Sequence, residues 1–353
     1  MSDGAGRIIL YGATGYTGGL IASAAARRGM ALLAAGRRAE VVRAVGARFG
    51  FETVAFGLDD RASIERALDG AAVVLNAAGP FSATAEPLAR ACLRAGVSYV
   101  DVTGEVRVLE RLAGLDAEAK GAGATLLPGA GFDVAPSDCL AAYLARRIGR
   151  VSRLRLTLDG LARVSRGTAK TALEAIGRGA AMRKAGRLVE VEGAVRGRAD
   201  FGDGPVATVA VGWGDVATAF RSTGAPDIET HFVDRLPLRA VAGLPRPARR
   251  LLGSGPAQAA LRALVDATMR GPGEAETGRC RILGEAWDAG GRRVAALTTT
   301  GGPYALTAET ALETAVRVAD GSVIPGFQTP ATAFGPDFAL AFEGVSRRDI
   351  DGA

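Results

Sequence analysis

The stretch that decides the fold is Gly12-Ala13-Thr14-Gly15-Tyr16-Thr17-Gly18, which lies between the apolar run Arg7–Tyr11 and an amphipathic run that ends at Arg28. A strand that passes through spaced glycines into a helix is typical of a dinucleotide-binding turn. Gly12 permits the tight turn, Gly15 lets backbone amides approach a diphosphate, and Gly18 lets helix and strand pack closely. The expected diphosphate-binding residues, at the start of this helix, are Gly12, Thr14, Gly15, Tyr16, Thr17 and Gly18.

The residues around this turn repeat a short apolar strand followed by an amphipathic helix, a rhythm that indicates a parallel βαβ sheet. The expected strands are Arg7–Tyr11, Met30–Ala35, Glu52–Phe56, Ala72–Leu75, Val97–Asp101 and Ala124–Leu127. Six such strands with right-handed crossovers predict a doubly wound Rossmann sheet, an α/β domain over residues 1–135.

After residue 135 strands follow one another with few helices between them, which favours a mostly antiparallel sheet in an α+β domain. We expect this second domain over residues 136–325, and we expect residues 326–353 to return to the Rossmann domain. The expected strands are Arg153–Asp159, Val206–Val211, Ile228–Val233, Gly278–Trp287 and Arg293–Thr300, and the expected helices include Thr168–Met182 and Thr307–Val318.

Composition excludes several classes of protein. With 48% hydrophobic and 23% charged residues, the chain is typical of a globular protein. It has no apolar run long enough to span a membrane. Of its 43 basic residues only three are lysines, and the arginines are spread along the chain. With 5% aromatic residues as well, the net charge of +6 does not indicate nucleic-acid binding.

The cysteines Cys92, Cys139 and Cys280 match no metal-binding or redox spacing, so we expect no metal site and a reducing compartment. The first residues show no signal-peptide pattern. These observations favour a cytoplasmic protein.

The end of the second strand predicts which dinucleotide is bound. Domains that bind NAD usually carry Asp or Glu there, for the ribose 2′-hydroxyl. This chain has Gly36-Arg37-Arg38 instead. A guanidinium can clamp a 2′-phosphate that a carboxylate would repel, so Arg37, with Arg38, predicts NADP(H). Alternatively, the two arginines only begin the next helix.

Polar residues after the third and fourth strands have two interpretations each. Asp60, next to Asp59, could bond the adenine amino group or cap the next helix. Asn76, the only asparagine, could bond the nicotinamide ribose or form an Asx turn that shapes its loop. Its neighbours Ala77, Gly79 and Pro80 would keep the backbone close to the cofactor.

The loops after the fifth and sixth strands carry the candidate proton donors. Alternation places Tyr99, Asp101 and Thr103 on one face of the fifth strand. Asp133 follows the sixth strand. We expect the catalytic residues to be Tyr99, Asp101 and Asp133, with Thr168 and Tyr304 as further candidates from the second domain. His231, the only histidine, is expected to pack within a strand.

Several motifs together resemble the saccharopine dehydrogenase-like family, and most closely its branch of trans-acting enoyl reductases. In the first domain they are Gly12–Gly18, Gly36-Arg37, Asn76–Phe81, Tyr99–Glu105 and Pro128–Asp138, and beyond it Ser165–Thr168, Gly224–Pro226, Gly301–Tyr304 and Thr329–Ala331. The resemblance implies NADPH dependence, and a second domain that binds substrate and forms a homodimer. It does not imply a particular substrate.

These observations predict an NADPH-dependent reductase that transfers hydride to a C=C or C=N bond of a small or acyl-carrier-bound substrate. The alternative is a catalytically silent NADP-binding sensor or scaffold. No Tyr-x-x-x-Lys pair stands on a Rossmann helix, and the lack of an obvious acid keeps that alternative open.

Overall fold

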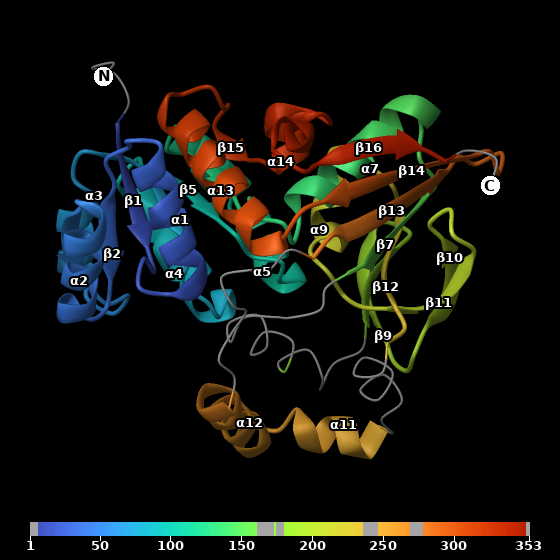
Figure 1. Cartoon of the computed structure of the whole chain (residues 1–353), viewed down its shortest axis with the longest axis horizontal. Coiled ribbons are helices and arrows are strands. Elements are labelled where there is room, and N and C mark those ends of the chain that lie inside the picture. The colour runs from blue at the N-terminus through green and yellow to red at the C-terminus, as the bar shows by residue number, and fades with distance from the viewer. Residues whose placement is uncertain (1–5, 161–172, 174–179, 236–245, 269–277, 351–353) are drawn as a thin grey trace. The chain divides into compact units, whose positions relative to one another are not determined.

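The computed structural model describes residues 6–160, 173, 180–235, 246–268 and 278–350 (Figure 1). The chain divides into two compact units. Unit 1 comprises Met1–Ala135 and Tyr304–Gly335, and unit 2 comprises Pro136–Pro303 and Pro336–Ala353.

Unit 1 is built on sheet A, seven parallel strands in the order β15-β6-β5-β4-β1-β2-β3. The strands are β1 (Arg7–Tyr11), β2 (Leu33–Gly36), β3 (Glu52–Ala55), β4 (Ala71–Asn76), β5 (Ser98–Asp101), β6 (Thr125–Leu127) and β15 (Gly326–Phe327). The order 3-2-1-4-5-6 is that of a Rossmann sheet, so the predicted doubly wound sheet is confirmed. The order in which successive strands are added reverses between β1 and β4, and sheets of this kind bind their ligands at such a point.

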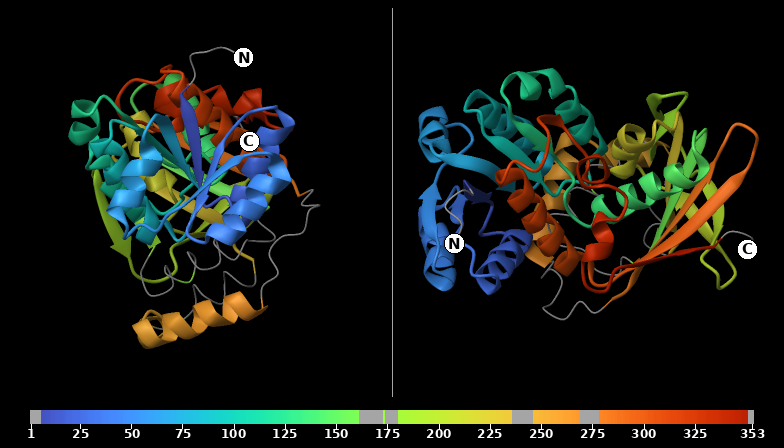
Figure 2. Two further views of the ribbon diagram at one scale, coloured as in Figure 1. Left: turned by 90° about the vertical axis from the view of Figure 1, so that its left-hand side faces the viewer. Right: turned by 90° about the horizontal axis from the view of Figure 1, so that it is seen from above.

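Helices cover both faces of sheet A (Figures 1 and 2). They are α1 (Tyr16–Arg27), α2 (Ala39–Phe49), α3 (Arg61–Leu68), α4 (Phe81–Arg94), α5 (Val106–Ala113), α6 (Asp116–Gly121), α13 (Pro303–Ala319) and α14 (Pro330–Phe334).

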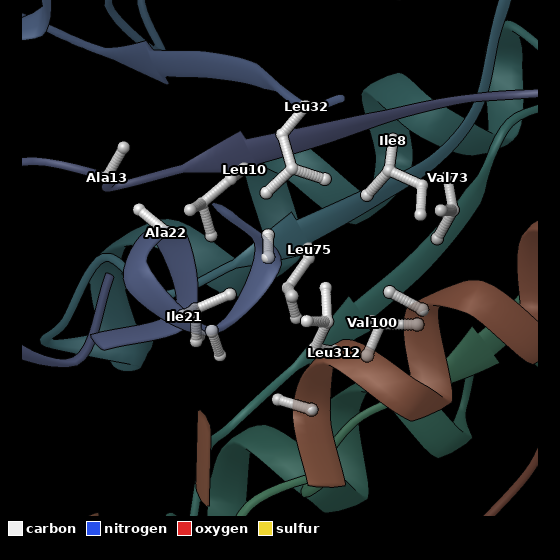
Figure 3. Packing of buried hydrophobic residues seen from close by; sticks show 14 of the residues in the cluster. Ile8, Leu10, Ala13, Ile21, Ala22, Leu32, Val73, Leu75, Val100 and Leu312 are labelled. Carbon is white, nitrogen blue, oxygen red and sulfur yellow. The ribbon is translucent and has the colours of Figure 1, made fainter. Parts of the chain in front are cut away.

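Alternation along β1 builds a core on each face of the sheet. Ile8 and Leu10 pack on the face covered by α1 and α13, where Leu312 lies with Leu75 and Val100 (Figure 3). Ile9 and Tyr11 pack on the opposite face. Because both faces are buried, β1 is apolar at nearly every position, as central strands of parallel sheets are.

Unit 2 is built on sheet B, whose path is β10-β11-β12-β7-β13-β14-β16, with β8 paired to β12 and β9. Among the strands that the structure describes in this sheet, only β12 and β7 pair in parallel, so the expected mostly antiparallel α+β architecture is confirmed. The strands are β7 (Arg153–Asp159), β8 (Ala180–Lys184), β9 (Arg187–Val191), β10 (Arg196–Asp200), β11 (Pro205–Ala210), β12 (Asp227–Val233), β13 (Cys280–Trp287), β14 (Arg293–Thr300) and β16 (Ser346–Asp349).

The helices of this part of the chain are α7 (Ala135–Ile148), α9 (Asp215–Thr223), α11 (Arg246–Leu252), α12 (Gly255–Thr268) and a 3₁₀ turn at Phe338–Ala341. Helix α7 packs closely on β13, because a Cβ at Gly284 would lie 2.6 Å from the Leu144 side chain. No helix among the described residues is long and apolar enough to span a membrane.

The domain bounds differ from those that the sequence predicts. Residues 304–325 lie in unit 1 rather than with the second domain, because the apolar face of α13 packs on sheet A through residues such as Leu312. Of residues 326–353, those up to Gly335 return to unit 1 through β15 and α14, whereas residues 336–353 lie in unit 2, where β16 pairs with β14.

Several elements of unit 2 differ from the sequence prediction. The predicted helix Thr168–Met182 is wrong at its end, where Ala180 begins β8, and its other residues lie outside the described ranges apart from Leu173. β8 and β9 form a hairpin through Ala185 and Gly186, both with positive φ. This is the two-residue turn that hairpins favour, but Ala-Gly is not its usual sequence signal, so the hairpin was not predicted.

Candidate functional site

The phosphate loop in unit 1 has no room for side chains at two of its glycines. Gly12 has φ +86°, and a Cβ there would lie 2.7 Å from the Ala78 backbone nitrogen. A Cβ at Gly18 would lie 2.8 Å from the Gly12 carbonyl carbon and 2.9 Å from the Ala13 Cα. The loop is therefore held directly against the backbone that follows β4 and against the first turn of α1.

The start of α1 is suited to bind an anion. Gly15 is the N-cap residue and has no side chain with which to cap the helix, and the first turn of the helix has no acidic residue. Thr14, Gly15 and Tyr16 are exposed, and Thr17 is half-buried. A hollow of about 280 Å³ adjoins the loop and is lined by Ala13, Thr14, Gly15, Gly19, Val41, Ala44, Val45, Arg48 and Phe49. The backbone amides and the helix dipole at this end favour a phosphate group.

The carboxyl end of β2 presents cations to solvent. Arg37 and Arg38 are both exposed, and Arg38 is the N-cap residue of α2. The arrangement fits a 2′-phosphate. It is compatible also with the alternative interpretation that these residues begin a helix.

Tyr11, at the end of β1, belongs to this region although the sequence did not single it out. Its ring is 2% exposed and stacks on Phe56, with 5.0 Å between the ring centroids. Burial raises the pKa of its hydroxyl, the Arg37 guanidinium lowers it, and the Asp59 carboxylate raises it. The tyrosine hydroxyl therefore lies within electrostatic range of both charged groups.

Asp60 is the N-cap residue of α3. Its Oδ1 accepts a hydrogen bond of 3.0 Å from the Ser63 backbone, and its Oδ2 accepts one of 2.6 Å from the Ser63 hydroxyl. These bonds lower the pKa of its carboxyl. Of the two interpretations of this residue, the geometry shows the helix cap.

Asn76 is wholly buried at the end of β4, and neighbouring groups use both ends of its amide. Its Oδ1 accepts from the Ala78 backbone at 2.9 Å, which makes an Asx turn. Its Nδ2 lies 3.0 Å from the Tyr99 hydroxyl and 3.3 Å from the Thr84 hydroxyl. The side chain thus shapes the loop that carries Ala77, Gly79 and Pro80.

Tyr99 and Asp101 continue this network across β5, and neither is exposed. The Tyr99 hydroxyl donates to Asp101 Oδ2 at 2.8 Å. Asp101 Oδ1 accepts from the backbones of Thr103 and Gly129, at 2.9 and 3.0 Å. The network therefore ties together the loops that follow β4, β5 and β6.

Burial governs the protonation of this network. It raises the pKa of Asp101 to about 6, against the lowering effect of the backbone N–H groups of Thr103 and Gly129. Burial, and next the Asp101 carboxylate, raise the pKa of Tyr99 well above its usual value. At neutral pH Tyr99 is therefore a hydrogen-bonded neutral phenol.

Glu105 has a role that the sequence did not indicate. Its two carboxylate oxygens accept from the backbone nitrogens of Phe81 and Ser82, each at 2.9 Å. It therefore caps α4, and it is also the N-cap residue of α5, which begins one residue after it.

Asp133, after β6, differs from Tyr99 and Asp101. It is partly exposed, and no residue that the structure describes hydrogen-bonds its carboxylate. It lies against Gly104 in the loop after β5, where a Cβ would be 3.2 Å from Asp133 Oδ2. Burial raises the pKa of its carboxyl to about 7, so it can hold or release a proton near neutral pH.

Helix α13 brings another residue to this edge of sheet A. Thr307 Oγ1 accepts from the Phe132 backbone at 3.0 Å, and Tyr304 lies edge-to-face against Tyr16, with 5.1 Å between the ring centroids. Tyr304 therefore belongs to unit 1, rather than to the second domain as the sequence predicts. Thr168, the other candidate from that domain, lies outside the described residues.

His231 lies in unit 2 and is 2% exposed, packed within a strand as expected. Its Nδ1 is 3.1 Å from the Thr208 hydroxyl, and its Nε2 is 3.4 Å from Glu229 Oε2. Within the described ranges, no group of three or more His, Cys, Asp or Glu residues could hold a metal ion.

Comparison with known proteins identifies the first part of the chain. Residues 8–127 match the family model described as the saccharopine dehydrogenase NADP binding domain. A trans-acting enoyl reductase of Mycobacterium ulcerans (strain Agy99) is 34% identical over 148 residues, which cover 40% of this chain and 35% of that protein. One of Mycobacterium leprae (strain TN) is 34% identical over 149 residues, 40% of this chain and 36% of that protein. The chain thus matches about a third of the length of these relatives.

Among solved structures, apo saccharopine dehydrogenase (L-Glu forming) from Saccharomyces cerevisiae covers 98% of this chain and 100% of its own, with a TM-score of 0.66 and 14% sequence identity. This likeness shows a shared fold. The family match of residues 8–127 confirms the predicted resemblance and the nicotinamide cofactor. Residues 8–127 of this chain are thus similar to the NADP-binding domain of saccharopine dehydrogenases.

Proposed function

We propose that the protein is an NADPH-dependent reductase that transfers hydride to a C=C or C=N bond of a small or carrier-bound substrate. The observation that carries this proposal is the tight turn from β1 into α1, where Gly12 and Gly18 have no room for a side chain, next to the end of β2, which is followed by exposed Arg37 and Arg38. The bound dinucleotide supplies the hydride, and the chain binds and orients it. The names of the relatives favour an enoyl group as acceptor.

We assign cofactor binding to the phosphate loop and to the exposed arginines after β2, and separate these residues from those that shape the edge of the sheet. The cofactor-binding group is Gly12, Thr14, Gly15, Tyr16, Thr17, Gly18, Arg37 and Arg38. The backbone of Ala77, Gly79 and Pro80 would lie close to the cofactor. Asp60 and Asn76 act as a helix cap and a loop former, because their side-chain oxygens accept from nearby backbone groups.

Asp133 is the proposed proton donor. Reduction of a C=C or C=N bond needs a proton on the atom next to the carbon that receives the hydride. Of the three expected catalytic residues, Tyr99 and Asp101 bond to each other and to backbone, whereas Asp133 keeps a carboxyl group with a pKa of about 7. Tyr99 and Asp101 then position the loops around it.

The substrate-binding region and the partners of the protein are also proposals. We place substrate binding and homodimer formation in unit 2, and the protein in the cytoplasm, without a nucleic-acid partner. Sedimentation of the purified protein at several concentrations measures its oligomeric state, and a monomer at all of them would refute the dimer.

Hydride transfer is tested directly with NADPH deuterated at either face of C4. The purified protein is incubated with short- and long-chain enoyl thioesters, free and attached to a carrier protein, and with cyclic imines. Transfer of deuterium from one face to one class of acceptor is the expected result. Saturable NADPH binding with no transfer to any acceptor would favour the silent sensor or scaffold, and no binding would refute both.

The role of Asp133 is tested by the pH profile. Because a general acid must be protonated, the wild-type rate should fall as the pH rises through about 7. The Asp133→Asn variant should be slower by about two orders of magnitude and lack this fall. Asp69→Asn, an exposed residue at the C-cap of α3, is the control and should behave as wild type. An unchanged profile in Asp133→Asn would remove Asp133 from the mechanism.

A further inference from the structure

We propose that Tyr304 is a cofactor-binding residue, which positions the nicotinamide half of the dinucleotide from the C-terminal part of the chain. The inference rests on the proposed function and deepens it. It concerns a residue almost 300 positions from the phosphate loop, outside the region 8–127 that matches the NADP-binding family.

The position of α13 on sheet A is fixed at several points. Leu312 packs with Leu75 and Val100 in the core (Figure 3). Glu309 forms ion pairs with Arg27 and Arg28 at the end of α1, at 3.1 and 2.6 Å. A second carboxylate, from Glu313, lies 3.2 Å from Arg28. Tyr304, in the first turn of α13, therefore has a defined place relative to α1.

The two helices run side by side in the same direction (Figure 1). Their first residues meet through the rings of Tyr16 and Tyr304, and α13 contacts the end of α1 further along through Glu309. Tyr16 is the first residue of α1 and follows the N-cap residue Gly15. The Tyr304 ring thus lies next to the backbone amides that are proposed to bind the diphosphate.

The strand order shows which half of the dinucleotide Tyr304 can reach. Thr307, three residues later and on the same face of α13, binds the backbone after β6, while Tyr304 meets the residue that begins α1 after β1. In sheet A, β5 and β4 lie between β6 and β1. The first turn of α13 therefore borders the β4–β5–β6 side, opposite the β2 end, where Arg37 would hold the adenosine 2′-phosphate.

The chemistry of Tyr304 fits this place. Side chains in an α-helix tilt toward its N-terminus, so the phenol of a first-turn residue projects past the end of the helix. It is partly exposed, and its ring is held by an edge-to-face contact with interplanar angle 85°. A phenol hydroxyl there can donate to the phosphate or ribose oxygens of the nicotinamide half, while the ring packs beside Tyr16.

The test compares a whole cofactor with half of one. NADPH and adenosine 2′,5′-bisphosphate, which lacks the nicotinamide half, are titrated into the full-length protein by calorimetry. Tyr304→Ala should bind NADPH about tenfold more weakly or worse and bind the bisphosphate as wild type does. Tyr304→Phe, which keeps the ring, should lose part of the NADPH affinity.

Two controls separate this inference from the proposed function. Tyr143→Phe changes a tyrosine of unit 2 whose hydroxyl bonds to Asp349, and it should bind both ligands as wild type does. Arg37→Ala should weaken binding of both ligands. Wild-type affinity of Tyr304→Ala for NADPH, or equal losses for both ligands, would overturn the role of Tyr304 while leaving the reductase proposal standing. Failure of the wild type to bind NADPH would overturn both.

Discussion

The carboxyl ends of β1 and β2 and those of β4 and β5 lie along one edge of sheet A, but their polar residues are used differently. After β1 and β2, Thr14 and Arg37 are exposed, and the N-cap residue of α1 is Gly15, which has no side chain. At the ends of β4 and β5, Asn76, Tyr99 and Asp101 are wholly buried and hydrogen-bonded to one another. The first region is open to a ligand, and the second is a closed internal network.

The difference shows that a polar residue at the end of a parallel strand is not by that fact a ligand group. Loops at this edge must also be held in place, and buried polar groups that bond to one another do this well. A group that binds a ligand must keep hydrogen-bonding capacity that the fold itself does not use. By this criterion we propose that Arg37 and Asp133 contact the ligand, whereas Tyr99 and Asp101 hold the loops in place.

The largest effect is expected at Gly18, where the open region depends on close backbone packing. Gly18→Ala would place a Cβ against Gly12 and Ala13, so we expect a loss of about 3 kcal/mol or more in the free energy of unfolding. Chemical denaturation measures it. The matched control is Gly19→Ala, because a Cβ there meets no described atom within 4 Å. If the two variants are equally stable, the loop is not packed as described.

Arg37→Ala tests the ligand side of the comparison. Loss of a charged hydrogen bond to the 2′-phosphate should weaken NADPH binding by about 1.5–3 kcal/mol and leave NADH binding almost unchanged. Fluorescence titration with both nucleotides measures this. Arg43→Ala, an exposed arginine of α2, is the control and should change neither affinity. Equal losses for NADPH and NADH would show that Arg37 does not read the 2′-phosphate.

Tyr99→Phe tests the framework side. The variant leaves Asp101 Oδ2 and Asn76 Nδ2 without the hydroxyl that joins them, so the free energy of unfolding should fall by about 1–3 kcal/mol. NADPH affinity should change little, because the phenol faces the network. A variant as stable as wild type but unable to catalyse would instead indicate that Tyr99 is a catalytic residue. The polar residues after β4 and β5 would then not be purely structural.

The smallest effect is expected for Asp60→Ala, which removes the cap of α3. We expect a small fall in melting temperature and no change in NADPH affinity. Its neighbour Asp59, which has no hydrogen bond to a described side chain, provides the comparison, and Asp59→Ala should leave the melting temperature unchanged. Weaker NADPH binding by Asp60→Ala, at an unchanged melting temperature, would indicate that Asp60 binds the cofactor.

The sequence predicted the doubly wound sheet and the glycine-rich loop after its first strand because their signals are local. The nearly continuous apolar run of β1, the spaced glycines after it and the helix that begins within a few residues are all visible in a short window of sequence. It also predicted that His231 packs within a strand. The β8–β9 hairpin was missed because its Ala185-Gly186 turn lacks the usual residue signal.

A Rossmann domain with a glycine-rich turn after β1 and a cationic end to β2 could thus be predicted from the sequence, since those features depend on backbone conformation and on neighbours in the chain. Only the tertiary structure decided which polar residues bond to one another and which do not. In the folded protein Asn76, Tyr99 and Asp101 form one hydrogen-bonded network, and Asp133 lies outside it. Helix α13 packs on sheet A, and its Tyr304 contacts Tyr16. Burial and contacts between distant segments are set by how the chain packs, and no short stretch of sequence contains that information.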